Sequence, residues 1–536
     1  MVRAALPASF LILFVTALLL LFVPADAEEE TFFSSKDLAL ADASDAMVLE
    51  LGAEGAVISQ PGTYVLSGRV ENGTIRVEPE EEGTVYLLLN GVIVHNESGP
   101  ALISDGCDKL ILTLAEGTEN ALTQGSQVSS EETVAAVYSR DDLTLNGTGA
   151  LLVSSGSGDG INCRDSLRIV GGEITVDALD DGLVGKDEVS IGGGTLVITA
   201  QEGDGIKSTN DEDASRGFVA VTGGDITITT GEGHSGAAPS ADGWGSRSSW
   251  EAQEADSSSQ KGLKAETDLI LTGGSLTVDT PDDALHANGN ITLSGGTLVL
   301  ATDDDAMHAD GTLTISAGDL FITASYEGLE ATDIAISGGT LRITASDDGI
   351  NGAGGDQAEA GSGGWGGEMG RFGRDMFSSS TGTLEISGGV ITVYAGGDGV
   401  DINGSITMSG AQVYVLGSPS SGNSALDYDG TFTLTGGTLV AAGASGMAQG
   451  VSDPSIPGTA VSVSDSGAIR VEDAQGETIV QFDAEGSFNH VVVYSDRFAE
   501  NESYTLISGS SSQSVTMSVQ ASGLSGRTGR GGRRGP

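Results

Sequence analysis

Residues 283–329 read DALHANGNITLSGGTLVLATDDDAMHADGTLTISAGDLFITASYEGL, and this stretch decides the fold. It contains the same triplet three times: an acidic residue, then Gly or Ala, then an aliphatic residue. The copies, Asp283-Ala284-Leu285, Asp305-Ala306-Met307 and Glu327-Gly328-Leu329, begin 22 residues apart. Each interval holds short alternating runs rich in β-branched residues, together with a small-residue pair such as Gly295-Gly296. The pattern predicts a repeat of about three short strands per unit, with turns between them.

The triplet recurs along most of the chain, and uninterrupted copies are 21 to 23 residues apart. The segment Lys261-Gly262-Leu263 keeps the phase but lacks the acid. No stretch shows strong helical periodicity, and no connection is long enough for a regular βαβ crossover. Further acidic triplets begin at Asp159, Asp181, Asp204, Asp348 and Asp398.

Short strands at this period suit one coil of a parallel β-helix. Each strand would pair with its equivalent one coil later, about 4.8 Å away, so that aliphatic residues would form ladders in a continuous core. A leucine-rich repeat has a similar period, but its spaced leucines and asparagine are missing, and calcium-binding nonapeptide repeats are much shorter. We therefore expect an all-β solenoid of about 22-residue coils. A β-propeller with blades near 40 residues is the alternative.

The period also predicts the organisation of the chain. We expect the coils to span residues 49–458, with long insertions at 231–260 and 351–380 where the triplet spacing jumps. Residues 459–520 break the period but keep alternating strands, which indicates a C-terminal β-rich cap. We expect residues 28–48 to be a linker and the Gly/Arg-rich tail, residues 521–536, to be disordered.

The N-terminus predicts secretion. Residues 1–27 have the layout of a signal peptide: Arg3, an apolar run from Phe10 to Val23, and small residues at Ala25-Asp26-Ala27. A membrane anchor is the alternative, but the run of about 14 residues is shorter than the roughly 20 that a span requires. We expect a secreted, extracellular protein that could associate with the cell surface, in an environment where calcium is abundant.

Charge excludes several kinds of partner. The 536 residues include 23 Lys and Arg against 76 Asp and Glu, for a formal net charge of −53. Such a chain should be repelled by nucleic acid and by anionic membrane surfaces, and we expect neither as a partner. At 38% hydrophobic it is too apolar for a wholly disordered acidic chain.

The two cysteines are expected to be unpaired, although secretion favours disulfides. Cys107 and Cys163 precede equivalent strands two coils apart, which would separate them by roughly 9–10 Å along the axis. A disulfide requires Cα atoms within about 6.8 Å.

Stacked coils would bring acidic residues of successive turns close together. Carboxylates one strand spacing apart repel each other by roughly 1 kcal/mol per pair even in water, and bound cations would relieve the repulsion. Calcium prefers six to eight oxygen ligands, so we expect bound calcium at these turns; a solvated acidic face is the alternative. The candidate ligands are Asp180, Asp181, Asp204, Asp282, Asp283, Asp304, Asp305, Asp347 and Asp348.

A second ladder follows the aliphatic residue of each triplet and includes Lys207, Lys264, His286 and His308. Two adjacent histidines beside acids could act as acid/base groups or metal ligands, but such ladders are more often solvent-facing polar residues. The chain has no nucleophile elbow, phosphate loop or His-rich zinc signature, so we lean towards a protein that is not an enzyme.

The ordered set of motifs resembles a known family. Gly62-Thr63-Tyr64-Val65-Leu66-Ser67-Gly68, Asp141-Asp142-Leu143-Thr144-Leu145-Asn146-Gly147 and Asp204-Gly205-Ile206-Lys207-Ser208-Thr209-Asn210 are similar to segments of secreted carbohydrate-binding domain-containing proteins with a pectate-lyase-like fold. A further matching segment is Leu112-Thr113-Leu114-Ala115-Glu116-Gly117-Thr118-Glu119-Asn120, and together the motifs cover roughly residues 45–510. The resemblance implies a right-handed parallel β-helix that binds cellulose or acidic polysaccharide, with bound calcium and no established catalytic centre. Lys261 departs from the pattern, which puts a metal at that coil in doubt.

The expected function is therefore non-catalytic polysaccharide binding, stabilised by calcium. All three tryptophans, Trp244, Trp250 and Trp365, lie in the expected insertions and are candidates for stacking on sugar rings, although loop tryptophans could equally anchor their own loops. Lys207 and Lys264 are further candidate sugar contacts. A calcium-dependent polysaccharide lyase, with these lysines as proton acceptors, and a surface adhesin or structural rod are the alternatives.

Overall fold

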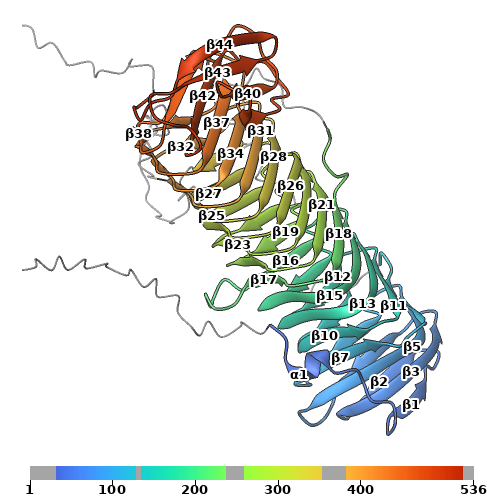
Figure 1. Ribbon diagram of the computed structural model, residues 1–536. Coiled ribbons are helices and arrows are strands. Elements are labelled where there is room, and N and C mark those ends of the chain that lie inside the picture. Colours follow the sequence, from blue (N-terminus) through green and yellow to red (C-terminus); the bar gives the residue numbers. More distant parts are fainter. Residues whose placement is uncertain (1–31, 128–134, 237–258, 353–381, 523–536) are drawn as a thin grey trace, which may run out of the picture.

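The computed structural model describes residues 32–127, 135–236, 259–352 and 382–522 (Figure 1). The described chain is all-β apart from the short helix α1 (Ser35–Leu38), which confirms the expected class. Its strands form one large, mostly parallel sheet and a separate four-stranded sheet at the C-terminal end. Figure 1 shows the strands stacked as successive rungs along an elongated body. No helix among the described residues is long and apolar enough to cross a membrane.

The parallel strands form three rows, in which each strand pairs with the equivalent strand of the next unit. The first row follows the acidic turn, and its register aligns the aliphatic residues of successive triplets, such as Leu263 with Leu285 and Leu285 with Met307. It comprises β2 (Gly55–Ile58), β4 (Thr74–Val77), β6 (Leu102–Ser104), β9 (Ala135–Ser139), β12 (Asp159–Cys163), β14 (Leu183–Gly185), β16 (Ile206–Ser208), β19 (Leu263–Ala265), β22 (Leu285–Ala287), the beginnings of β25 (Met307–Ile315) and β27 (Leu329–Ile336), then β29 (Ile350–Gly352), β32 (Asp401–Ile402) and β35 (Asp427–Tyr428).

The second row precedes the small-residue pair of each unit. It comprises β1 (Met47–Glu50), the beginnings of β3 (Gly62–Val70) and β5 (Thr84–Asn96), β7 (Lys109–Leu114), β10 (Asp142–Gly147), the beginnings of β13 (Ser166–Ala178) and β15 (Glu188–Ala200), β17 (Phe218–Val221), β20 (Leu269–Leu271), β23 (Ile291–Leu293), the ends of β25 and β27, β30 (Thr383–Ile386), β33 (Ser405–Met408), β36 (Phe432–Leu434) and β38 (Asp453–Pro454).

The third row follows that pair and ends at the next acidic turn. It comprises the ends of β3, β5, β13 and β15 together with β8 (Glu119–Gln124), β11 (Ala150–Ser155), β18 (Asp225–Thr230), β21 (Ser275–Thr280), β24 (Thr297–Thr302), β26 (Asp319–Ala324), β28 (Thr340–Ala345), β31 (Val390–Ala395), β34 (Gln412–Leu416) and β37 (Thr438–Gly443).

The core runs along the inside of the three rows. Alternate residues of many strands are buried, as in β21, where Leu276 and Val278 are almost inaccessible and Ser275 and Thr277 are exposed. Other strands, such as β7, are buried at every position. The second glycine of a pair lies at the corner between rows two and three and has a left-handed backbone, with φ of 84° at Gly274 and 90° at Gly296. Glycine adopts that conformation without the steric cost of a Cβ, so the pairs permit the corners.

The C-terminal strands change from parallel to antiparallel pairing. β42 (His490–Ser495) pairs antiparallel with β37 and with β39 (Gly458–Ser462), and so extends the third row. The separate antiparallel sheet contains β41 (Thr478–Phe482), β40 (Ile469–Glu472), β43 (Ser503–Ser508) and β44 (Ser511–Thr516). These strands lie within residues 459–520, where the break in the period predicted a cap.

Part of the expected linker is bound tightly to the coils. Asp37 in α1 is fully buried, and its Oδ1 accepts hydrogen bonds from Lys109 Nζ and the Thr144 hydroxyl, both at 2.6 Å. Asp142 lies between Lys109 and Arg168, at 3.4 and 3.1 Å. The segment is therefore held against the second strand row by a chain of buried ion pairs.

Both cysteines are free and buried. Ser104 aligns with Ser139, and Ser139 with Cys163, so Cys163 lies two coils beyond the end of β6. Cys107 lies three residues after that end. The two free thiols confirm the prediction that the cysteines are unpaired.

Candidate functional site

The turns between rows three and one form an edge that we call the acidic corner. It contains the first residue of each triplet: Asp159, Asp181, Asp204, Lys261, Asp283, Asp305, Glu327, Asp348 and Asp398. Several of these carboxylates accept a hydrogen bond from the backbone nitrogen of the next corner residue. The acceptor–donor pairs are Asp159–Asp181 (3.3 Å), Asp181–Asp204 (2.7 Å), Asp204–Lys261 (2.9 Å), Asp283–Asp305 (3.2 Å), Asp305–Glu327 (3.3 Å) and Asp348–Asp398 (2.6 Å).

Beside the acidic corner, the first row presents a second line of side chains, which we call the polar ladder. The parallel register aligns Lys207, Lys264, His286, His308, Glu330, Asn351 and Asp401 in that order. Each lies three residues after its corner residue. The ladder residue can therefore contact the carboxylate of its own turn or that of the turn before, and the identity of each ladder residue decides how the local acids are neutralised.

At the N-terminal end, Lys207 neutralises two candidate metal ligands. Its Nζ lies 3.2 Å from Asp181 Oδ2 and 3.1 Å from Asp204 Oδ2. Burial raises the pKa of Asp159 to about 7, and the neighbouring carboxylates of Asp181 and Asp180 add to the effect. Burial also opposes ionisation of Asp204, but the Lys207 ammonium together with hydrogen bonds from the Ser259 hydroxyl and the Lys261 backbone nitrogen lowers the pKa of that carboxyl.

At the middle coils, Lys261 takes the place of the missing acid. Its ammonium lies 2.7 Å from Asp282 Oδ1 and 2.8 Å from Asp283 Oδ2. Although burial of Asp283 opposes ionisation, Lys261 and His286 lower the pKa of that carboxyl. Asp304 lies with Asp282 and Asp283, and burial together with their charges raises its pKa to about 7.

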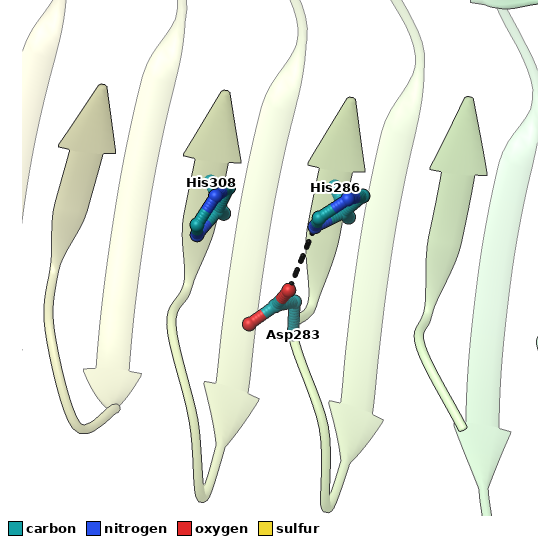
Figure 2. A group of neighbouring side chains, drawn as sticks. All are labelled: Asp283, His286 and His308. Atoms are coloured by element: carbon teal, nitrogen blue, oxygen red, sulfur yellow. Dashed lines mark hydrogen bonds and ion pairs between the residues drawn. The ribbon is translucent and has the colours of Figure 1, made fainter. Parts of the chain in front are cut away.

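The two histidines lie one above the other on neighbouring strands, with ring centroids 4.9 Å apart and planes inclined by 23° (Figure 2). His286 Nδ1 is 2.9 Å from Asp283 Oδ2, and His308 Nδ1 is 3.2 Å from both Asp305 Oδ2 and Glu330 Oε2. Burial opposes the charge on His308, but its acidic partners raise the pKa of this imidazole above its usual range.

In the part of the chain that the structure describes, the acidic residues at the C-terminal end of the corner lack the basic partners that several other corner acids have. Asp348, Asp398 and Asp401 place one carboxylate oxygen each within 4.8 Å of one another, and all three are partly buried. Among the described residues, no lysine, arginine or histidine forms an ion pair with them. Burial raises the pKa of Asp348 to about 9, of Asp398 to about 6 and of Asp401 to about 7. Neighbouring carboxylates add to the effect, chiefly Asp347 and Glu327 at Asp348, and Asp427 at Asp398 and Asp401. Three oxygen donors without a counter-ion suit a hard divalent cation.

The structure thus divides the nine candidate metal ligands by their partners. Asp181 and Asp204 pair with Lys207, Asp282 and Asp283 with Lys261, and Asp305 with His308, whereas Asp348 belongs to the group without a counter-ion. Asp180 lies beside Asp159 and Asp181, and Asp304 beside Asp282 and Asp283. Asp347 forms no ion pair with a described basic side chain. Asp159, Asp398 and Asp401 were not among the predicted ligands. The signals for them were present, since Asp159 and Asp398 begin triplets and Asp401 belongs to the second ladder.

Of the predicted sugar contacts, Lys207 and Lys264 lie side by side on the polar ladder. Lys207 is occupied by Asp181 and Asp204, whereas no carboxylate of the described chain lies within ion-pair distance of Lys264. Trp244, Trp250 and Trp365 lie outside the described residues, as do residues 1–27, where a signal peptide was expected, and most of the two expected insertions.

A polar groove of about 660 Å³ lies at the other end of the molecule, between the third row and β41. Gln412, Tyr414, Gln481 and Arg497 contribute to its lining. The Tyr414 hydroxyl donates to Gln412 Oε1 at 3.1 Å, and its ring contacts Phe482 at a centroid distance of 5.6 Å. The groove therefore presents one aromatic ring among mostly polar groups.

Comparisons with known proteins found similarity over part of the chain. Residues 54–306 match the family model described as carbohydrate-binding domain-containing protein. A carbohydrate-binding domain-containing protein of Acetivibrio thermocellus is 39% identical over 126 residues, which are 23% of this chain and 44% of that protein, so the match spans less than half of the relative. A solved structure titled as the polysaccharide lyase-like protein from C. thermocellum, gadolinium derivative, is 28% identical, covers 44% of this chain and 90% of that one, and has a TM-score of 0.36. Residues 54–306 are therefore similar to carbohydrate-binding domain-containing proteins.

Proposed function

We propose that this protein is a secreted, non-catalytic polysaccharide-binding protein that uses the first strand row around Lys264. The observation that carries the proposal is that Lys207 and Lys264 occupy adjacent positions of the polar ladder, inside the residues that match the carbohydrate-binding family model. We also propose that the three strand rows form a right-handed parallel β-helix, whose flank would offer an extended chain the same spacing at every coil.

The two lysines have different roles in this proposal. Lys207 neutralises Asp181 and Asp204 and keeps the acidic corner folded. Lys264 is partly buried and has no carboxylate within ion-pair distance among the described residues, although its charge acts on Asp204, so its ammonium can donate to sugar hydroxyl or carboxylate oxygens.

Calcium would be held by Asp348, Asp398 and Asp401. These residues fit the ion because calcium takes carboxylate oxygens in flexible geometry, and the group lacks any protein counter-ion in the described chain. The bound ion would replace the protons that burial and repulsion otherwise retain on these carboxylates. It would also reduce the charge of −53 that would repel an acidic polysaccharide.

A calcium-dependent lyase would require a base beside the metal. Lys264 and Asn351 are four positions apart on the polar ladder, or roughly 19 Å at the strand spacing of a sheet. The proposed calcium group begins at Asp348, three residues before Asn351, so Lys264 and that metal cannot act on one sugar ring. This separation favours binding over lyase chemistry.

The test is retention on polysaccharide. Full-length protein is applied to a glycan array and to insoluble cellulose, with and without chelator, and Lys264→Ala is compared with Lys186→Ala. Lys186 is a partly exposed lysine at the end of a neighbouring first-row strand, outside the polar ladder. We expect Lys264→Ala to weaken retention about tenfold, as for a lost charge-assisted hydrogen bond, and Lys186→Ala to leave it unchanged.

Other outcomes separate the alternatives. If both lysine variants were retained equally well, the polysaccharide would bind another surface of the protein, for example the Tyr414 groove. An unsaturated product absorbing in the ultraviolet would indicate a lyase, and binding to cells or matrix protein without binding to any isolated glycan would indicate an adhesin. Loss of retention in Trp244→Ala or Trp365→Ala stays a prediction for residues outside the described part of the chain.

A further inference from the structure

Hydrogen-bond acceptors surround the two stacked histidines, His286 and His308, in a way that polysaccharide binding does not explain. Each ring faces an oxygen atom on both of its nitrogens. His286 has Asp283 Oδ2 at 2.9 Å from Nδ1 and Asn288 Oδ1 at 3.1 Å from Nε2. His308 has Asp305 Oδ2 and Glu330 Oε2 at 3.2 Å from Nδ1, and Asp310 Oδ1 at 3.4 Å from Nε2.

The neighbours of His286 decide which of its nitrogens carries a proton. The Asn288 amide nitrogen donates to Glu266 Oε1 at 3.0 Å, and a carboxylate can only accept. The amide oxygen of Asn288 therefore points towards His286, and Nε2 must be the donor. The lone pair of a neutral imidazole would then lie on Nδ1, which faces the Asp283 carboxylate. Either a second proton or a metal cation must lie between these two atoms.

The same reasoning applies to His308, whose acceptors are carboxylates on both sides. If each ring took up an additional proton, two positively charged imidazolium rings would lie with their centroids 4.9 Å apart. One divalent cation bound to both Nδ1 atoms would satisfy the carboxylates without placing a charge on either ring. In metal sites, a ligating histidine usually donates its other N–H to a carboxylate or carbonyl oxygen, as Asn288 and Asp310 permit here.

We propose that Asp283, His286 and His308 form a binding site for a divalent transition metal ion of the zinc class. The three residues place one ligand atom each within 4.8 Å of one another, and they converge from two neighbouring strands and the turn before β22 (Figure 2). Imidazole nitrogen favours zinc, cobalt and nickel over calcium, whose ligands are oxygens. Asp305 and Glu330, which also contact His308 Nδ1, are placed to supply a further oxygen ligand.

Lys261 is the competing partner of this site. Its ammonium lies 2.8 Å from Asp283 Oδ2, on the side where the ion would bind. It also lies 2.7 Å from Asp282 Oδ1, so it keeps an acidic partner when the metal takes Asp283. The other oxygen of this carboxylate, Asp283 Oδ1, accepts a hydrogen bond from the backbone nitrogen of Asp305 at 3.2 Å. This hydrogen bond holds the carboxylate in position. The site shares no residue with the proposed calcium group or with Lys264, which lies next to His286 on the polar ladder.

The test uses the full-length protein, first freed of metal with a chelator and then saturated with calcium so that all-oxygen sites are occupied. Zinc chloride and cobalt chloride are titrated by calorimetry and by visible absorption. We expect one ion per chain, and binding at least about a hundredfold weaker in His286→Gln and in His308→Gln, because each removes a direct ligand. His95→Gln, in which the histidine contacts Thr123 and Glu97 instead, should bind like the unmodified chain.

A milder pair of variants separates metal binding from folding. Asn288 is exposed, so Asn288→Ala should leave the fold unchanged but weaken zinc about 10- to 100-fold through loss of the acceptor on His286 Nε2. Asn290→Ala, two residues along the same loop, should have no effect. Absorption spectroscopy at the zinc edge should detect two imidazole ligands. The proposal is overturned if zinc does not bind in calcium, if both histidine variants bind it normally, or if excess calcium displaces the cobalt.

Discussion

The Oδ1 atom of Asp181 accepts a hydrogen bond from the backbone nitrogen of Asp204 at 2.7 Å, although the two residues lie in successive coils. Asp204 repeats the relationship, since its Oδ1 accepts from the backbone nitrogen of Lys261 at 2.9 Å. The acids at the corner are therefore structural links between coils as well as surface charges. A substitution at one of them should affect stability before it affects any ligand.

Asp204→Ala is expected to destabilise the protein by about 3–5 kcal/mol. The side chain is fully buried, and its loss would leave the Lys261 backbone N–H without its acceptor and Lys207 with Asp181 alone. Asp180→Ala removes an exposed acid of the same corner and should change stability by no more than about 0.5 kcal/mol. The measurement is chemical denaturation of both variants; equal effects would show that the ladder of hydrogen bonds contributes little.

Calcium is expected to stabilise the fold through Asp398. A ligand that binds only the native state adds about 2.7 kcal/mol at a hundredfold excess over its Kd, so millimolar calcium should raise the melting temperature by several degrees, and magnesium by less. Asp398→Asn should abolish this increment, whereas Asp319→Asn, an exposed acid on β26, should preserve it. A melting temperature that does not respond to thorough chelation would contradict the calcium proposal.

The buried pair of Asp37 and Lys109 predicts a loss of stability in acid. Burial of Asp37 opposes ionisation, but the hydrogen bonds from Lys109, Ser34 and Thr144 lower its pKa from 3.8 to about 2. A lowered carboxyl pKa contributes stability that is present above pH 3.8 and is lost as the pH falls towards 2. The difference in unfolding free energy between the unmodified chain and Asp37→Asn should be about 2 kcal/mol near neutral pH and should shrink through that range. Exposed Asp45, replaced by Asn, should show no such trend.

The two thiols should be unreactive in the native protein. Burial raises the pKa of Cys107 to about 12, with the Asp141 carboxylate adding to the effect, and burial also raises the pKa of Cys163. Because the thiolate is the nucleophile, both should resist alkylation until the chain unfolds. Intact mass after alkylation of denatured, unreduced protein should show two added groups. No added group would indicate a disulfide and would require a different register between β6 and β12.

Several features of the fold could be predicted from the chain alone because they repeat. The triplet spacing and the alternation of residues such as Leu276 and Val278 follow from strand geometry, in which side chains alternate between two faces. The stacking of like residues then follows from the parallel register. The adjacency of His286 and His308, and of Lys207 and Lys264, was predictable on these grounds.

The partners of each carboxylate were not predictable in the same way. Side chains at a turn do not alternate, so the sequence could not indicate that Lys261 contacts both Asp282 and Asp283. Asp348 and Asp398 begin successive triplets on either side of the expected insertion, so the repeat itself places them in neighbouring coils. The sequence could not indicate that an Asp348 carboxylate oxygen accepts a hydrogen bond from the Asp398 backbone nitrogen. The sequence by itself determined the strand period, the core ladders and the acidic edge. Only the tertiary structure decided which acids share a basic partner and which have none among the described residues, because that depends on side-chain direction at the corner.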